Sequence, residues 1–163
     1  MTVAIYPGSF DPITVGHINI AERASRLVDQ VIIAVADQNY KNTLFSLAER
    51  KAFAEDVLAR LPSCKVITFD GLTVALARQY GAKTIIRGLR AVSDYEYEMQ
   101  VFAINKFLDY KLETVFLMSE AEYSFISSSM IKQAGRSGAD ISRLTTPMVE
   151  AALKKRFMEG KME

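Results

Sequence analysis

The chain contains a single histidine, His17, which lies in the stretch "PGSFDPITVGH" at residues 7–17. Two prolines and two glycines predict turns in this stretch, and Gly16 is expected to begin a helix. Free N–H groups at a helix start, with the positive end of the helix dipole, can bind an anion. Gly16 lets a ligand approach and His17 adds a side-chain donor, so the stretch predicts a phosphate-binding turn. The alternative is a tight turn with a histidine on the surface.

Further cations and hydroxyl groups lie in later loops. Arg87 and Arg90 flank Gly88 after an apolar run, and paired guanidinium groups bind phosphate well, although the alternative is a pair of solvated arginines. The serines of "FISSSM" at residues 127–129 would suit triphosphate oxygens, but serine in this place also caps a helix. Lys41 could reach an anionic substrate from another loop, or it could simply be solvated.

Two other groups of residues favour structural roles. The carboxylates in "SDYEYE" begin a predicted helix, where negative charge suits the helix dipole, so a structural interpretation is at least as good as a functional one. Cys64 is the only cysteine and is interpreted as core filler. No pair of Cys and His residues has the spacing of a zinc site, so we predict no metal ligands in the chain.

The elements that position these loops follow a regular alternation. Five β-branched runs predict strands, each buried on both faces, and six patterns predict helices. The strands are expected at residues 2–6, 31–36, 65–69, 83–87 and 114–118, and the helices near 16–29, 46–61, 72–80, 94–109, 128–136 and 147–159. This order predicts an α/β fold with a doubly wound, five-stranded parallel sheet, Rossmann-like, with helices at the C-terminal end. Ligands of such sheets bind beyond the carboxyl ends of the strands, where the loops described above lie.

Local signals support three of the helices. "SLAE" at residues 46–49 reads as a capping box, and Gly81 is expected as a C-cap. Thr146 with Pro147 is expected to begin the last helix.

Composition limits the classes of function. At 163 residues the chain is expected to form one domain, 1–163, and its 50% hydrophobic and 24% charged residues suit a globular protein. A formal net charge of +1 argues against nucleic acid or an anionic membrane as the main partner. With one cysteine, no secretory signal pattern and no apolar run of membrane-spanning length, the expected location is the cytoplasm.

The motifs resemble a known superfamily. The stretch lacks the pattern of a Walker loop and the Gly-x-Gly-x-x-Gly of dinucleotide folds. Instead, "SFDPITVGH" resembles the T/HxGH signature of nucleotidyltransferases, and "FISSSMIK" resembles their second element. Over residues 3–157 the chain is similar to the bacterial phosphopantetheine adenylyltransferase family, most closely in "AIYPGSFDPITVGH", "IIRGLRAVSDYEYEMQ" and "VFLMSEAEYSFISSSMIK".

The resemblance implies transfer of the adenylyl group of ATP to 4′-phosphopantetheine, with 3′-dephospho-CoA and pyrophosphate as products. It implies His17, Lys41 and Arg90 as catalytic residues. The residues implied to bind the acceptor substrate are Ser9, Lys41, Thr73 and Arg87. The residues implied to bind ATP are Ser9, Phe10, Gly16, His17, Gly88, Leu89, Arg90, Glu98, Tyr123, Ser124, Phe125, Ile126, Ser127, Ser128 and Ser129.

The resemblance also implies partners and an assembly. Mg²⁺ is expected with ATP, CoA is expected as a feedback inhibitor, and a homohexamer arranged as a dimer of trimers is expected in solution. The apolar face of "MQVFAINKFL" could form an interface or belong to the core. Three positions depart from the commonest family pattern: Ser9 replaces threonine, Tyr123 replaces tryptophan, and Thr73 replaces a larger apolar residue. Ser9 keeps the hydroxyl and Tyr123 keeps a ring, so only the contacts along the pantetheine arm are in doubt.

The implied reaction needs neither a general base nor a protein nucleophile. A phosphate monoester has a second pKa near 6, so the acceptor is already a dianion that can attack the α-phosphorus of ATP. What the protein must supply is in-line positioning and stabilisation of the developing charge. On this hypothesis His17 acts as a hydrogen-bond donor.

Two alternatives stay open on the sequence. One is another enzyme of the same superfamily, either a nicotinate-mononucleotide adenylyltransferase or a cytidylyltransferase, which would share the T/HxGH and late serine elements. The other is a non-catalytic sensor of CoA or a nucleotide on the same fold.

Overall fold

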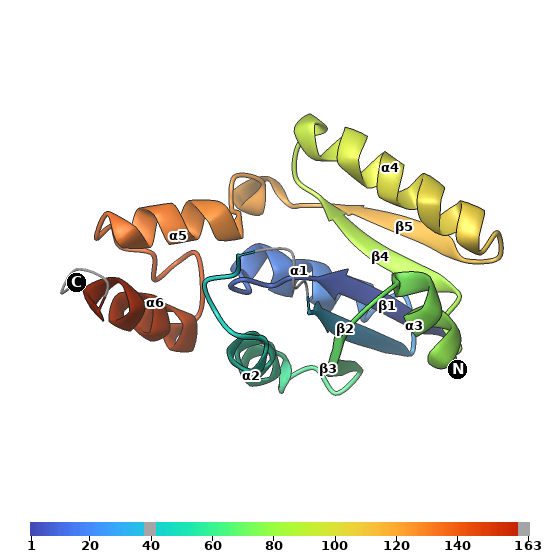
Figure 1. The fold of residues 1–163 in the computed structure, drawn as a ribbon, viewed down its shortest axis with the longest axis horizontal. Coiled ribbons are helices and arrows are strands. Elements are labelled where there is room, and N and C mark those ends of the chain that lie inside the picture. The colour runs from blue at the N-terminus through green and yellow to red at the C-terminus, as the bar shows by residue number, and fades with distance from the viewer. Residues whose placement is uncertain (38–41, 160–163) are drawn as a thin grey trace.

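The computed structural model describes residues 1–37 and 42–159 of the chain, in which strands and helices alternate (Figure 1). The strands are β1 (Val3–Gly8), β2 (Gln30–Ala36), β3 (Cys64–Phe69), β4 (Thr84–Leu89) and β5 (Glu113–Met118). The helices are α1 (Val15–Ala24), α2 (Leu47–Leu58), α3 (Thr73–Gln79), α4 (Val92–Leu108), α5 (Ser128–Arg136) and α6 (Pro147–Glu159), with a short 3₁₀ helix (Ala121–Tyr123) before α5. The predicted order of elements is confirmed. Among these described helices, none is long and apolar enough to cross a membrane.

The five strands form one parallel sheet in the order β3-β2-β1-β4-β5. The chain builds outward from β1 through β2 to β3, then crosses back to β4 on the other side of β1. The order of the strands therefore reverses between β1 and β4, which is where ligands of doubly wound sheets bind. This confirms the predicted fold class and brings the loops after β1 and β4 next to each other.

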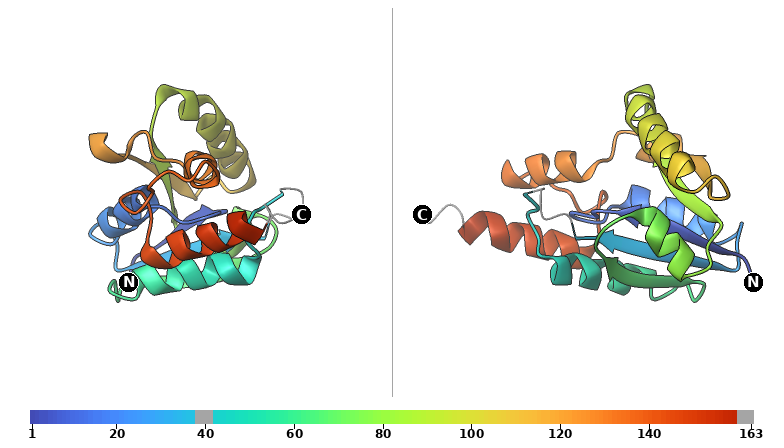
Figure 2. Two further views of the ribbon diagram at one scale, coloured as in Figure 1. Left: turned by 90° about the vertical axis from the view of Figure 1, so that its left-hand side faces the viewer. Right: turned by 45° about the vertical axis from the view of Figure 1, so that its right-hand side comes forward.

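The core has two layers, one on each face of the sheet. On one face, α1, α2, α5 and α6 pack against β1 and β2, and the largest fully buried side chains there include Ile33, Phe45 and Leu153. On the other face, α3 packs against Ile5, Ile32 and Ile85. Figure 2 shows α4 above the sheet on the side away from α2 and α6.

The prediction that every strand is buried on both faces is wrong for the two edge strands. The central residues of β1, β2 and β4 are buried, whereas β3 and β5 alternate exposed and partly buried positions. Val115 and Met118 of β5 are exposed. An edge strand has a neighbour on one side alone, and a β-branched sequence by itself does not distinguish an edge strand from a central one.

The first helix is shorter than predicted, because it ends at Ala24 rather than near residue 29. The N–H of Ser25 bonds to the carbonyl of Ala21, and the chain then turns toward β2. The Asp29 carboxylate accepts a hydrogen bond of 2.6 Å from the N–H of Thr2, which fixes the entry to β2 beside β1. The predicted local signals are confirmed elsewhere: Ser46 and Glu49 form the capping box of α2, and Gly81 has a φ of +63° after α3.

Candidate active site

The first loop leaves β1 through a strained residue. Phe10 has a φ of +47°, in the left-handed region that costs a non-glycine residue about 1–2 kcal/mol. Its ring is buried and meets the rings of Tyr6 and His17 edge-on, with centroids 5.4 Å and 5.2 Å away. A Cβ atom on Gly8 would lie 3.0 Å from the Phe10 ring, so any other residue there would push the ring aside by a few tenths of an ångström. The loop is therefore built around Phe10, which packs against the only histidine.

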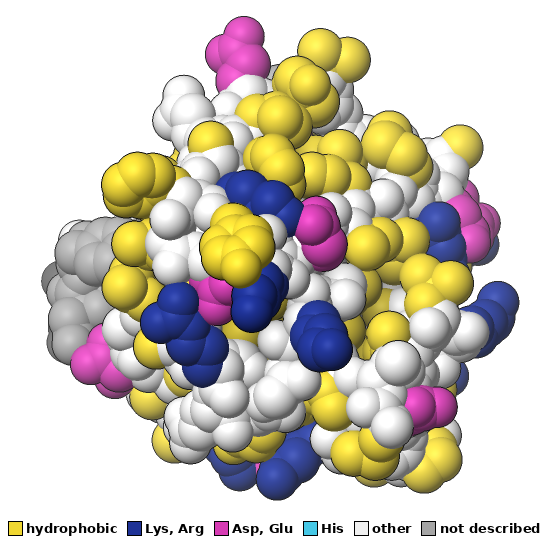
Figure 3. Space-filling model, turned by 90° about the vertical axis from the view of Figure 1, so that its right-hand side faces the viewer, with side chains coloured by type: hydrophobic (Ala, Val, Ile, Leu, Met, Phe, Trp, Pro, Cys, Tyr) yellow, Lys and Arg dark blue, Asp and Glu magenta, His cyan; other side chains and the backbone are white. Residues whose placement is uncertain are grey.

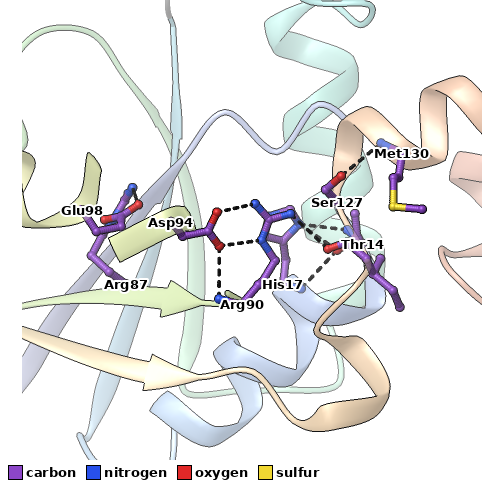
Figure 4. A network of polar contacts seen from close by, with 9 residues as sticks. Thr14, His17, Arg87, Arg90, Asp94, Glu98, Ser127 and Met130 are labelled. Carbon is purple, nitrogen blue, oxygen red and sulfur yellow. Dashed lines mark hydrogen bonds and ion pairs between the residues drawn. The ribbon is translucent and has the colours of Figure 1, made fainter. Parts of the chain in front are cut away.

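His17 is held by the N-cap of its own helix. The N–H of Thr14 donates to Nδ1 of His17 at 3.1 Å, and Oγ1 of Thr14 accepts from the N–H of His17 at 3.3 Å. A backbone N–H can only donate, so Nδ1 must be the acceptor and the proton of the neutral ring lies on Nε2. His17 therefore presents a hydrogen-bond donor, not a base, to whatever lies beyond Nε2 (Figure 4).

Burial, together with the positive charges of Arg90 and Arg87, lowers the pKa of His17 to about 4. The imidazole is therefore neutral at neutral pH in the free protein. A polyanion bound between His17 and the two arginines would raise this pKa, because opposite charge favours the protonated form.

We expect the pKa of His17 in the ligand-free protein to be about 4, against about 6.5 in the unfolded chain. Between these values the unfolded state binds more protons, so the free energy of unfolding falls as the pH drops from about 6.5 to 4, by at most about 3 kcal/mol. Titration by ¹⁵N NMR measures the pKa directly, because every imidazole signal belongs to His17. In His17→Gln this part of the pH dependence should disappear. A pKa at or above 6.5 would contradict the burial argument.

Arg87, at the carboxyl end of β4, is engaged by a carboxylate. Its Nε and Nη2 donate to the two carboxylate oxygens of Glu98 at 2.6 Å and 2.5 Å, and Nη1 donates to the carbonyl of Pro7 at 2.9 Å. Glu98 lies on α4 and is 8% exposed. The family resemblance implies that Glu98 binds ATP, which stays a prediction, whereas the contact made in the structure orients Arg87.

Arg90 forms a second pair of the same kind. Its Nε and Nη2 donate to the carboxylate of Asp94, each at 3.1 Å, and Nη1 donates to the carbonyl of Ile126 at 3.3 Å. Figure 4 shows Arg90 between Asp94 and the His17 ring. The two arginines thus lie in the site as predicted, but each is paired with a carboxylate from the first two turns of α4. An incoming phosphate must share these guanidinium groups with the carboxylates.

The late serines stand at the N-terminus of α5, and two of their hydroxyls already have partners in the chain. Oγ of Ser127 caps the helix by accepting from the N–H of Met130 at 3.1 Å. The hydroxyl of Ser128 donates to the carbonyl of Pro12 at 2.8 Å. Simple capping therefore accounts for Ser127, while Ser129 is exposed at the helix start.

One cleft of about 540 Å³ brings most of these residues together at the carboxyl ends of β1 and β4. The predicted residues that line it are Ser9, Phe10, Gly16, His17, Thr73, Arg87, Gly88, Arg90, Glu98, Ile126, Ser127, Ser128 and Ser129. Four predicted ATP residues lie among the described residues but not on its wall: Leu89, Tyr123, Ser124 and Phe125. Lys41 lies outside the described residues.

The position of Tyr123 explains why it is not on the wall. A Cβ atom on Gly16 would lie 3.7 Å from Cβ of Tyr123. Tyr123 therefore packs against the start of α1, and Phe125 is more than half exposed on the surface. Any contact of these two side chains with ATP would require the loop before α5 to approach the nucleotide.

The first loop is also tied to the last third of the chain, which the sequence did not indicate. The carboxylate of Asp11 accepts from Nζ of Lys132 at 2.7 Å and from the N–H groups of Leu44 and Phe45 at 3.0 Å. Asp11 is 5% exposed. A partner 121 residues away leaves no local signal.

Two further bonds complete this connection. The hydroxyl of Thr145 donates to the carbonyl of Ile13 at 3.1 Å, and the N–H of Val15 donates to the carbonyl of Leu144 at 3.2 Å. The segment between α5 and α6 therefore fixes the entry to α1. Among the residues that sequence reasoning missed, Thr14 did have a signal, since a threonine three positions before His17 fits an N-cap.

Comparison with known proteins defines the class. The profile of the cytidylyltransferase-like family matches residues 5–134, which is most of the chain and runs from within β1 to within α5. A solved structure from Vibrio parahaemolyticus, of a protein provisionally assigned as a nicotinate-nucleotide adenylyltransferase, has the same fold. Its TM-score is 0.65 at 22% identity, over 94% of this chain and 99% of that one. The protein is thus a nucleotidyltransferase of the cytidylyltransferase-like class.

The comparison also reaches a particular family. Phosphopantetheine adenylyltransferase of Moorella thermoacetica (strain ATCC 39073 / JCM 9320) is 52% identical over 157 residues, which cover 96% of this chain and 98% of that protein. The chain belongs to the phosphopantetheine adenylyltransferases, and the resemblance seen in the sequence motifs is confirmed.

Proposed function

We propose that this protein transfers the adenylyl group of ATP to 4′-phosphopantetheine and releases 3′-dephospho-CoA and pyrophosphate, a step of coenzyme A biosynthesis. The near full-length match supports the choice of acceptor. The observation that carries the chemistry is the hydrogen bond from the N–H of Thr14 to Nδ1 of His17, which commits the ring to donating from Nε2. A site with a fixed donor beside two arginines suits transfer between polyanions.

The reaction begins with two ligands placed in line across the cleft. The acceptor phosphate, a dianion at neutral pH, attacks the α-phosphorus directly, so no side chain has to remove a proton. Arg87 would hold the acceptor phosphate, Thr73 at the start of α3 would lie along its arm, and the hydroxyl of Ser9 would lie between the two substrates. Lys41, as the sequence predicts, would add a further cation.

Hydrogen-bond donors that are already oriented would stabilise the charge that develops on the ATP phosphates. Nε2–H of His17 would donate to an oxygen of the α-phosphate, where preorganised donors act most strongly. Arg90 and the N-terminus of α5 with Ser129 would stabilise the leaving pyrophosphate. The protein supplies positioning and electrostatics, which is typical of nucleotidyl and phosphoryl transfer.

Mg²⁺ is proposed to enter with ATP. Among the described residues, no three His, Cys, Asp or Glu side chains converge as a metal site. The cleft carboxylates Asp94 and Glu98 are paired with arginines, so the site fits an ion held mainly by phosphate oxygens and water. When bound, the ion neutralises charge on the phosphates.

The experiment that tests the function measures pyrophosphate release. The purified protein with ATP and Mg²⁺ is titrated with 4′-phosphopantetheine, nicotinate mononucleotide and glycerol phosphate in parallel. Of the three acceptors, we expect only 4′-phosphopantetheine to give pyrophosphate release. Activity on either of the other two acceptors alone would overturn the choice of substrate, and tight CoA binding without release under any condition would indicate a sensor. Inhibition by added CoA tests the expected feedback.

We also propose that the chain assembles into a homohexamer arranged as a dimer of trimers. The support is the outer surface of α4: among its described side chains Glu98 is the one buried residue, while Ile104 and Phe107 are 60% and 88% exposed. Figure 3 shows many hydrophobic side chains over the upper part of the molecule, at the height of α4. Large exposed apolar patches mark interaction sites, and a second copy of the chain would cover this one.

For Phe107→Glu we expect a species of lower mass than the unmodified protein, because a charge would have to be buried in the interface. Size-exclusion chromatography with light scattering measures the mass. Leu27→Glu, which alters an exposed leucine beyond α1, is the matched control and should keep the mass of the unmodified protein. A monomeric unmodified protein would reject the hexamer.

A further inference from the structure

Arg50 of α2 is the largest fully buried side chain outside the cleft, with 2% of its surface exposed. Arginine is rarely buried unless its charge is paired, because removing a guanidinium from water is costly. Arg50 does not line the cleft. Arg50 belongs to none of the sequence motifs described above, and the proposed reaction does not use it.

The guanidinium of Arg50 bonds to backbone carbonyls from three segments. Nη1 donates to the carbonyl of Ser9 at 2.7 Å and to that of Ala36 at 2.8 Å. Nε donates to the carbonyl of Phe45 at 3.2 Å. Within residues 1–37 and 42–159, no carboxylate lies within ion-pair distance of it. Arg50 thus joins the carboxyl ends of β1 and β2 to the start of α2.

One of these bonds falls on the strained part of the first loop. The carbonyl of Ser9 belongs to the peptide that leads into Phe10, whose φ is +47°. The ring of Phe10 then meets the ring of His17 edge-on at 5.2 Å. A continuous path of contacts therefore runs from Arg50 through the Ser9 peptide and Phe10 to the histidine.

The bond from Arg50 to the carbonyl of Ala36 holds another part of the cleft wall. Ser9, which follows β1, and Ala36, the last residue of the neighbouring strand β2, both line the cleft. Nη1 of Arg50 donates to both carbonyls at once, so it holds the two segments in a fixed position relative to each other. The fork of a guanidinium can reach three separate carbonyls, whereas the single ammonium of lysine has its donors on one atom.

We infer that Arg50 is a positioning residue: by holding the Ser9 carbonyl it keeps Phe10 in the left-handed conformation, and Phe10 in turn sets the His17 ring. Arg50 touches neither substrate and acts through these residues. Its effect on turnover rests on the proposed function, but its effect on the His17 ring does not.

Arg50→Lys tests this inference, since it keeps the charge and removes the fork. We expect the ¹⁵N and ¹H signals of the His17 ring to shift or broaden. We also expect kcat to fall about tenfold to a hundredfold, the range for a small misplacement of a catalytic group. Leu153→Ala, in the core contributed by α6, should lower Tm while leaving the His17 signals and kcat unchanged. Lys51→Gln removes a positive charge from the next residue of α2, on the surface, and should leave the His17 signals and kcat unchanged.

The outcomes separate the two proposals. Unchanged His17 signals and near-normal kcat in a folded Arg50→Lys overturn the positioning role. Altered His17 signals in a protein that shows no adenylyl transfer even when unmodified would support the positioning role and reject the proposed function. If the variant does not fold, hydrogen exchange is measured on the unmodified protein instead. The guanidinium N–H protons of Arg50 are expected to exchange slowly with water, and fast exchange would overturn the proposal.

Discussion

His17→Ala should lower kcat by about 10² to 10³, the usual cost of removing one donor aimed at developing charge. The affinity for ATP should change much less, because the donor is needed most in the transition state. Single-turnover kinetics and calorimetric titration with ATP measure the two quantities separately. The fixed Nε2–H is the reason for expecting a donor effect rather than the loss of a base.

The matched variant for this experiment is His17→Gln. Its side-chain amide can place an N–H near the former Nε2, so part of the lost turnover should return. Near-normal turnover of the alanine variant would exclude His17 from the chemistry. A deficit of the alanine variant that shrinks as the pH falls, because the unmodified protein loses turnover when His17 is protonated, would instead indicate a base.

Arg87→Met should have the second large effect, on stability as well as activity. The substitution leaves the carboxylate of Glu98, whose side chain is 10% exposed, without its cation. Removing one partner of a buried pair typically costs about 3–5 kcal/mol. The KM for the acceptor should rise too, since Arg87 is proposed to hold its phosphate. Chemical denaturation and steady-state kinetics measure the two effects.

The double variant Arg87→Met with Glu98→Gln separates the structural and functional roles of the arginine. Neutralising the carboxylate removes the uncompensated charge, so much of the stability should return while turnover stays low. Full recovery of turnover in the double variant would show that Arg87 serves the fold alone. Glu98→Gln by itself should weaken acceptor binding if Glu98 orients Arg87, and ATP binding if it contacts the nucleotide as the sequence predicts.

The fold could be predicted almost entirely, because its signals are local. β-branched runs bounded by turn residues identify strands, and their alternation with helical patterns leaves a parallel sheet as the consistent arrangement. The rule that ligands bind at the carboxyl ends then selected the loops that line the cleft. β3 and β5 were predicted as strands, but their burial on both faces was predicted wrongly, since which strand lies at a sheet edge depends on how the chain crosses over.

The partners of the site residues were much less predictable. Arg87 and Arg90 were expected to bind phosphate, and no partner within the chain was predicted for either, yet both are paired with carboxylates of α4. The carboxylates that begin α4 were predicted to suit the helix dipole, and the resemblance implied that Glu98 binds ATP, so neither prediction paired them with the arginines. Phe10 carried no sign of its left-handed backbone, because glycine is the residue that usually indicates such a conformation.

The ties between the first loop and the end of the chain affect how the protein matures during synthesis. Asp11 and Ile13 need Lys132 and Thr145, which are made 121 and 132 residues later. Contacts of such long separation form late in folding, because the loop between them must close first. The nascent chain therefore carries its histidine and glycines from the start, yet the first loop gains these partners only after Lys132 and Thr145 have left the ribosome.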